Sequence, residues 1–429
     1  MRRAGTKHRA GRLPRRLGCP RALGVNICWG DFCGRRQVLR VSIGRKGQRF
    51  APACRGALLA QSPIILRLPF LIALIVVSGA VSAAADAGKE DDAAALARKG
   101  TDAIDRRQFG EALDAFTRAM ALQPEDASLC FGAGVAAFML GQNEAAQSRF
   151  ECALTLNPDY LEAAVWLGDL HYRAGRLSEA IAIYKMVLRR SARRSDLEAQ
   201  LATWSKEREL HDRFREVRTE HFSICFESLS DEPLAQETAD RLENAYRRIS
   251  NTLGVYPSER ITVVLYTREQ FSTITRLASW SAAAYDGRIR LPIAGTSQPR
   301  EELDRILSHE FVHAVVATLA GRTAPAWLSE GLATVLEPSG SEDAEAPLAR
   351  VGLPRDVSKL HQPFVDLSKG DAEIAYASAA RAVRLLIEQR GTSAIVAVLR
   401  DLGQGTLFAK AFQRRIEMSY RDFAALARN

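Results

Sequence analysis

Hydrophobic and small residues between positions 93 and 193 recur with a period of 34 residues. Each unit has a glycine at one position and an aromatic residue sixteen positions later. The apolar positions follow the period of amphipathic helices, so each unit predicts two helices that cross closely at the glycine. Three such units are enough to form a stable all-α solenoid. The glycines are Gly100, Gly134 and Gly168, and the aromatic residues are Phe116, Phe150 and Tyr184.

The pattern changes after the repeats. Residues 194–218 are charged with helical spacing, which predicts a capping helix that links the repeats to a second domain. Short apolar runs at 221–227 and 261–266 predict strands, with an amphipathic helix at 234–253 between them. The run at 288–293 alternates charged and apolar residues and contains a proline, which predicts an edge strand.

The last part of the chain is predicted to be helical. Helical patterns cover 300–320 and 326–337, and further helices follow a loop rich in proline and acidic residues that ends near 368. Strands followed by helices are typical of an α+β domain. The chain is therefore expected to be multidomain, with an all-α solenoid over 93–193 and an α+β domain over 219–429.

Charge is distributed unevenly along the chain. The 429 residues are 47% hydrophobic and 25% charged, as in ordinary globular proteins. The net charge of +9 arises in residues 1–67, which contain 16 Lys or Arg and one acidic residue, whereas the remainder contains 43 basic and 49 acidic residues. A nucleic-acid-binding surface would be basic in the folded domain, so we expect no nucleic-acid partner.

The N-terminal leader contains a candidate export signal. Residues 68–77 form a continuous apolar run, preceded by a basic residue and followed by small residues up to Ala85. This order is typical of a secretory signal peptide, and an uncleaved membrane anchor fits the same segment. We interpret 1–62 as a basic leader from an over-extended start and 63–85 as the signal peptide or anchor. The protein is then exported, and is periplasmic or anchored facing the extracytoplasmic side.

The region after the leader contains three cysteines, Cys130, Cys152 and Cys225. Their odd number and the absence of C-x-x-C spacing argue against a disulfide framework and a thiolate zinc site. Cys130 and Cys152 lie in apolar helical stretches. They are therefore predicted to be buried thiols.

A candidate metal site lies in the helix predicted over 300–320. His309, Glu310 and His313 form the pattern H-E-x-x-H. Histidines four residues apart lie on one helix face, so both imidazoles can bind one zinc ion, and Glu310 beside them can take a proton from bound water. Apolar residues surround the motif, and burying two imidazoles and a carboxylate without an ion would be costly.

A catalytic zinc ion needs a third protein ligand. Glu330 lies on the next predicted helix, which can fold back beside the first after the turn at 321–325. Glu337, seven residues further and on the same helix face, is the alternative. Glu330 is favoured because the adjacent Gly331 would let the two helices approach closely at that level.

These motifs resemble two known families. The 34-residue period is similar to that of the tetratricopeptide repeat, although the aromatic residue expected four positions before the shared glycine is absent. Residues 219–429 resemble the peptidase MA-like domain of gluzincin metallopeptidases at 286–292 (DGRIRLP), at H-E-x-x-H and at 327–333 (WLSEGLA). This second resemblance implies zinc-dependent hydrolysis of a peptide or protein substrate. The implied zinc ligands are His309, His313 and Glu330.

The same resemblance assigns further roles. Glu310 is implied to be the catalytic base, and Tyr376 to stabilise the oxyanion. The strand at 288–293 would pair with an extended substrate, and the repeats would bind a substrate or protein partner. Thr334 stands where thermolysin-like enzymes have an acidic residue that holds a histidine, so another residue must do this. The alternative function is an inactive peptidase-like scaffold, or a membrane-associated assembly factor anchored by 68–85, that acts through its repeats.

Overall fold

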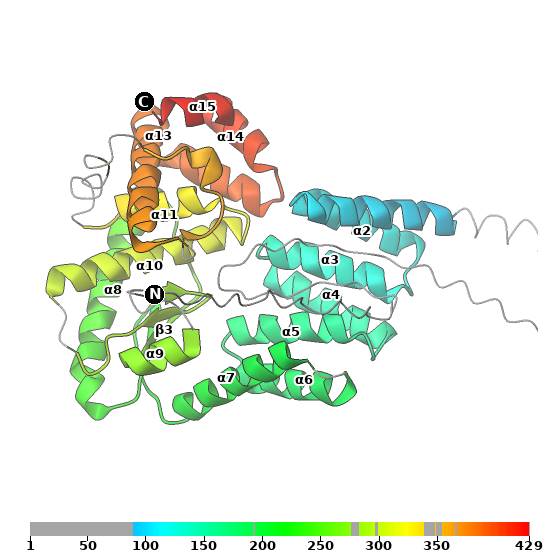
Figure 1. The fold of residues 1–429 in the computed structure, drawn as a ribbon, viewed down its shortest axis with the longest axis horizontal. Helices are drawn as coiled ribbons and strands as arrows, with labels where there is room; N and C mark the ends of the chain where they lie inside the picture. The colour runs from blue at the N-terminus through cyan, green and yellow to red at the C-terminus, as the bar shows by residue number, and fades with distance from the viewer. Residues whose placement is uncertain are drawn as a thin grey trace, which may run out of the picture.

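The computed structural model describes residues 89–191, 194–275, 283–296, 299–338, 348, 354–364 and 367–428. The predicted leader and signal segment lie outside these residues. None of the helices described has the length and apolar character needed to span a membrane. An N-terminal array of helices lies beside a C-terminal part that combines a mixed β-sheet with further helices (Figure 1).

The N-terminal array consists of helix pairs. The pairs are a helix over 89–105 with α2 (Phe109–Leu122), α3 (Ala127–Met139) with α4 (Asn143–Leu156), and α5 (Leu161–Arg173) with α6 (Leu177–Arg190). In every pair, a Cβ atom on the repeated glycine would lie 2.6–2.8 Å from the ring of the repeated aromatic residue. The helices can therefore pack this closely only with glycine at that position, as the repeat pattern predicts.

The prediction of buried thiols in the repeats is wrong. Cys130 of α3 and Cys152 of α4 form a disulfide bond. Packing of the two helices brings their Cα atoms to 6.0 Å, which is within the usual range for a disulfide. The relative rotation of two helices decides this distance, and the spacing of the cysteines in the sequence does not report it.

The sheet has the strand order β1-β2-β3-β5-β4 in the described part of the chain. The parallel strands β2, β3 and β5 form its centre, and β1 and β4 are antiparallel edge strands. The strands are β1 (Arg215–Arg218), β2 (Phe222–Phe226), β3 (Ile261–Leu265), β4 (Ala284–Tyr285) and β5 (Ile289–Leu291).

Two sequence predictions for the sheet are corrected. The helix predicted within 194–218 ends at His211, as α7 (Ser195–His211), and is followed by β1. Pairing of β1 with β2 overrides the local helical pattern. The run at 288–293 is not at the edge, because β4 pairs with the outer side of β5. Pro292 follows the last residue of β5 and so removes no hydrogen bond from its paired residues.

Long helices pack with the sheet into one hydrophobic core. The long helices are α8 (Glu232–Leu253), α10 (Arg300–Ala320), α11 (Ala326–Val335) and α13 (Lys369–Gly403), which breaks at Gly391 with φ of +76°. The smaller elements are η1 (Leu229–Asp231), α9 (Arg268–Thr275), η3 (Val357–Lys359), α14 (Phe408–Ile416) and α15 (Tyr420–Leu426).

The repeats contact the C-terminal part backbone to backbone. Gly141, in the α3–α4 turn, lies against Gly321, which ends α10, and a Cβ atom on Gly141 would be 2.6 Å from the Cα of Gly321. The backbone N–H of Arg322 donates a hydrogen bond to the carbonyl of Met139 at 3.0 Å. The end of α3 is thereby fixed to the end of α10.

A buried charge cluster joins the same two parts. Glu207 of α7 is fully buried and accepts hydrogen bonds from Tyr172 of α5 at 2.8 Å and from Arg290 of β5 at 2.7 Å. Burial alone would raise the pKa of Glu207, but Arg290 and Arg288 hold it below its usual value. Removing one partner of such a cluster would leave a buried unpaired charge, so the cluster resists separation of repeats and sheet.

Replacing Gly141 by Ala should destabilise the protein more than replacing Gly175 by Ala. Both glycines have φ of +77°, so both variants carry a similar backbone strain of about 1–2 kcal/mol. Only at Gly141 does the new methyl group meet another backbone, whereas nothing lies within 4 Å of a Cβ atom at Gly175. We expect Gly141→Ala to lower the free energy of unfolding in urea by a further ~1–3 kcal/mol. Equal losses in the two variants would contradict the contact with Gly321.

Candidate active site

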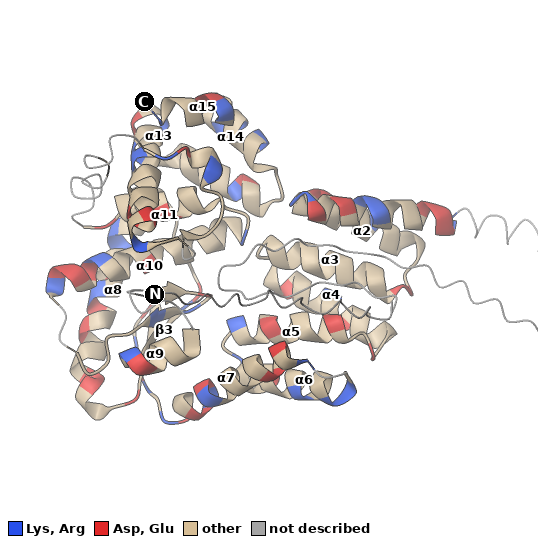
Figure 2. Ribbon diagram, in the orientation of Figure 1, with Lys and Arg blue, Asp and Glu red and all other residues tan. Residues whose placement is uncertain are grey.

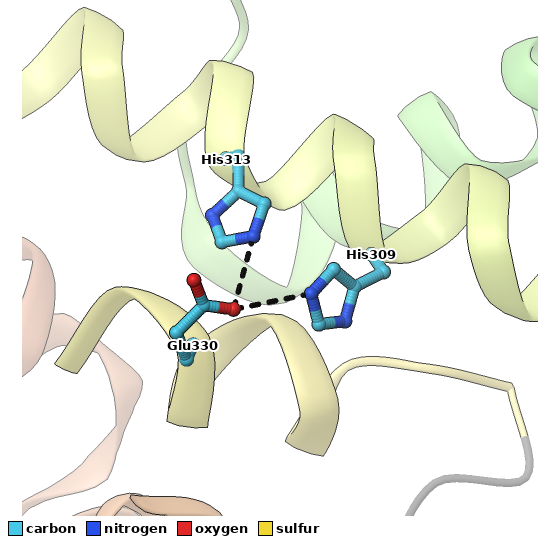
Figure 3. A group of neighbouring side chains, drawn as sticks. All are labelled: His309, His313 and Glu330. Atoms are coloured by element: carbon cyan, nitrogen blue, oxygen red, sulfur yellow. Dashed lines mark hydrogen bonds and ion pairs between the residues drawn. The ribbon is translucent and has the colours of Figure 1, made fainter. Parts of the chain in front are cut away.

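Helices α10 and α11 bring the three predicted ligands together. The Oε2 atom of Glu330 lies 3.3 Å from Nε2 of His309 and 3.3 Å from Nε2 of His313 (Figure 3). The candidate ligand atoms of the three residues all lie within 4.8 Å of one another. Two imidazole nitrogens and a carboxylate oxygen are a donor set that can hold zinc.

Each histidine is held from behind through its Nδ1 atom. Nδ1 of His309 lies 2.8 Å from a carboxylate oxygen of Glu337, and Nδ1 of His313 lies 2.9 Å from Oγ of Ser329. These contacts turn both Nε2 atoms toward Glu330. Carboxylates and hydroxyls behind a ligating histidine fix its orientation in this way.

The structure separates the roles of the two candidate third ligands. Glu330 faces both Nε2 atoms, whereas Glu337 lies behind His309 and also contacts Arg305 at 3.5 Å. Glu337 therefore holds the His309 imidazole in its orientation. Glu337 lies just beyond the end of α11, two residues after Val335, and its seven-residue spacing from Glu330 was the available signal in the sequence.

Gly331 does not act as predicted. A Cβ atom on Gly331 would lie 2.4 Å from the carbonyl oxygen of Ala379, so the glycine permits close approach of α13 and not of α10. Successive residues of a helix are about 100° apart around its axis. When Glu330 faces α10, its neighbour therefore faces the helix on another side of α11.

The ionisation of the site is strongly coupled. Burial alone would lower the pKa of His309, but hydrogen bonds with Glu330 and Glu337 raise it to about 10. Burial alone would raise the pKa of Glu330, but the charge of His313 and the hydrogen bonds with both histidines hold it far below its usual value. A cation is thus favoured between the Nε2 atoms and Glu330, whether it is a proton or a metal ion.

Glu310 lies beside this group and has a buried oxygen, Oε2, to which no described residue donates a hydrogen bond. Glu310 as a whole is 7% exposed. Burial raises the pKa of the Glu310 carboxyl, with a smaller rise from Glu330, although the two histidines oppose the change. A carboxylate with a raised pKa is a better proton acceptor near neutral pH than an exposed one.

Tyr376 of α13 stands close to the first histidine. Its ring centroid lies 6.3 Å from that of His309 and 5.1 Å from that of Phe364. Burial raises the pKa of Tyr376 well above its usual value, and the charges of Glu330 and Glu310 add to this. The phenol therefore stays protonated and can donate a hydrogen bond.

The site opens into a cleft of about 1800 Å³ between the repeats and the C-terminal part. Its lining includes the candidate site residues, the edge strand β4 and two turns of the repeats, α3–α4 and α5–α6. No pattern in the sequence indicates that the repeats line the same cleft as the H-E-x-x-H motif. That arrangement depends on the contact between Gly141 and Gly321.

Comparison with known proteins identifies the repeats. A family model described as tetratricopeptide repeat matches residues 98–146 and 133–195. The solved structure "First TPR of Spaghetti (RPAP3) bound to HSP90 peptide SRMEEVD" matches with 25% sequence identity, 28% of this chain and 95% of that chain covered, and a TM-score of 0.27. No curated protein matches the chain. Residues 98–195 are therefore tetratricopeptide repeats, an architecture whose concave surface binds other proteins.

Proposed function

We propose that this chain is an exported zinc-dependent peptidase whose repeats bind the substrate or a protein partner. The observation that carries the proposal is the convergence of His309, His313 and Glu330 beside the buried Glu310. Under this proposal the C-terminal part is a zincin-like α+β domain. The disulfide between Cys130 and Cys152 supports export, because disulfides persist in oxidising compartments.

The donor atoms suit a zinc ion in both chemistry and spacing. Ligands at about 2.0–2.1 Å from a tetrahedral ion lie about 3.3 Å from one another. Glu330 Oε2 lies at 3.3 Å from both Nε2 atoms. Bound zinc lowers the pKa of its water and polarises a substrate carbonyl.

The protein groups around the donors supply the remaining chemistry. Glu310, which lines the cleft, accepts a proton from the attacking water through its carboxylate and passes it to the leaving amine. Tyr376 donates a hydrogen bond to the oxyanion. Glu337 and Ser329 keep the imidazoles of His309 and His313 oriented throughout.

The cleft suits a peptide better than a small metabolite. Its volume of about 1800 Å³ exceeds the ~300–1,000 Å³ of ordinary small-molecule pockets. Ala284 and Tyr285 of β4 line it, and β4 is the edge strand on that side of the sheet. An extended substrate would therefore pair with β4 and not with the run at 288–293.

The second candidate function is a scaffold that acts through its repeats. The tetratricopeptide match of residues 98–195 supports protein binding by itself. A scaffold does not need a buried carboxylate that is directed into a cleft. Hydrolysis by the unmodified, zinc-loaded chain, compared with that by Glu310→Gln, separates the peptidase from the scaffold.

Purified protein should contain close to one zinc ion per chain by elemental analysis. Glu330→Ala should lose it, because only two histidine ligands remain. Glu337→Gln should weaken zinc binding about 10–100-fold, since His309 loses the carboxylate that orients it. Glu301→Gln, an exposed change on α10, is the control and should bind normally. Absence of zinc from the unmodified chain, or full retention in Glu330→Ala, would contradict the assignment.

Glu310→Gln should reduce hydrolysis of unfolded casein about 10²–10⁴-fold while zinc content stays unchanged. The amide keeps the size of the side chain but cannot accept the proton from water. Release of fluorescent peptides measures the rate, and elemental analysis of the same sample is the control. Wild-type rates in this variant would rule out the mechanism. Absence of hydrolysis in the unmodified, zinc-loaded chain would favour the scaffold.

Tyr376→Phe should lower kcat for the same substrate about 10²–10³-fold. The variant keeps the ring that packs beside Phe364 and removes only the hydroxyl. KM and the midpoint of thermal unfolding should change little. If the tyrosine only fills space, kcat will remain at the wild-type value.

A further inference from the structure

Two arginines meet inside the cleft where the repeats join the C-terminal part. Arg322 directly follows Gly321, which ends α10, and Arg173 is the last residue of α5. The Cζ atoms of Arg322 and Arg173 lie 3.8 Å and 5.9 Å from the ring centroid of Phe138. Both arginines line the cleft that contains Glu310. In Figure 2, the end of α5 nearest the C-terminal part carries the blue of Lys and Arg.

Arg322 has no carboxylate partner within the described part of the chain. Its side chain donates to the carbonyl of Phe138 at 2.5 Å and stacks on the Phe138 ring. Burial, and the nearby charge of Arg173, lower the pKa of Arg322 to about 9, against a small opposing effect of Tyr285. Its positive charge is thus poorly compensated by the protein.

The surrounding charges add to this positive excess. Glu207 and Asp286 are the carboxylates of the adjacent buried cluster, and both form ion pairs with Arg290. Arg288 adds a second positive charge to that cluster, 3.2 Å from Glu207. Glu144 and Glu259 also line the cleft, but neither forms an ion pair with Arg322.

We propose that Arg322 forms a subsite for a carboxylate group of the peptide substrate. The inference rests on the proposed peptidase function and extends it to a substrate class. The guanidinium group is suited to this role, because it can donate two parallel hydrogen bonds to a carboxylate. The carboxylate is either the C-terminal one or an Asp or Glu side chain.

Arg322 lies beyond the end of α10, so the subsite is separated from the scissile bond. His313 precedes Ala320, the last residue of α10, by seven residues, which is about 10 Å along the helix axis. An extended peptide covers this distance with about three residues. The carboxylate is therefore expected at least three residues from the bond that is cleaved.

The repeats are part of this subsite. Phe138 and Arg173 both belong to the repeats, whereas Arg322 belongs to the C-terminal part. The repeats thus form one wall of the substrate cleft. Substrate selection at this wall requires the junction between the two parts to stay closed.

The test measures binding of labelled peptides to the Glu310→Gln protein by fluorescence anisotropy. Neutral nine-residue peptides carry either a free or an amidated C-terminus, and a second series places Glu or Gln at successive internal positions. We expect one carboxylate to tighten binding about 10–100-fold over its amide counterpart. The series that shows the effect identifies the source of the carboxylate.

Variants of Arg322 in the Glu310→Gln background assign the effect to this site. Arg322→Gln should reduce the ratio of carboxylate to amide binding to about one, and Arg322→Glu should favour a peptide with Lys at the same position. Arg260→Gln is the control, because Arg260 is an exposed arginine lining the same cleft. Comparing two peptides on one variant makes the ratio independent of the fraction that folds.

The outcomes separate failure of the subsite from failure of the peptidase assignment. Equal binding of carboxylate and amide peptides, no binding of any peptide, or an unchanged ratio in Arg322→Gln would overturn the subsite. If the native chain hydrolyses no peptide and yet the ratio depends on Arg322, the peptidase function is wrong and the carboxylate site stands.

Discussion

The backbone contact between Gly141 and Gly321 fixes the geometry on which the cleft depends. Any side chain at either position would push α3 and α10 apart, since a Cβ atom on Gly321 would lie 2.3 Å from the carbonyl carbon of Leu140. Because α10 also carries the H-E-x-x-H motif, the contact places the repeats at a defined distance from that motif. The Glu207–Arg290 cluster opposes opening on the side of the sheet. The cleft is therefore a property of both parts together.

The candidate site contains more negative than positive charge, and this excess has to be compensated. Three buried or half-buried carboxylates, Glu310, Glu330 and Glu337, surround two imidazoles, with Arg305 at the outer edge. In a low-dielectric interior such an excess of negative charge is costly unless a cation lies among the carboxylates. The metal-free protein meets this need with a proton, which is why the pKa of His309 rises to about 10. A divalent cation between the same atoms would meet it more completely.

Local patterns in the sequence predicted the features that depend on local geometry. The 34-residue spacing of glycine and aromatic residues predicted the helix pairs, and four-residue spacing placed His309 and His313 on one face of α10. The disulfide, the partner of Gly331 and the orienting role of Glu337 depend on how helices rotate against one another. The order of the strands likewise depends on pairing between segments that are far apart in the sequence. No periodicity in a single segment reports such relations.

Under the proposed peptidase function, the position of the repeats links ligand binding on the repeats to substrate binding in the cleft. In a peptidase with a separate recruitment module, the module raises the local substrate concentration and leaves the selectivity of the cleft unchanged. Here the α3–α4 and α5–α6 turns line the same cleft as Glu310, and Arg322 bonds the end of α3. A ligand on the repeats and a peptide in the cleft would then share a wall. If a ligand on the repeats shifts this wall, it changes the affinity of the cleft for its peptide. By linkage, the peptide then changes the affinity of the repeats for the ligand by the same factor.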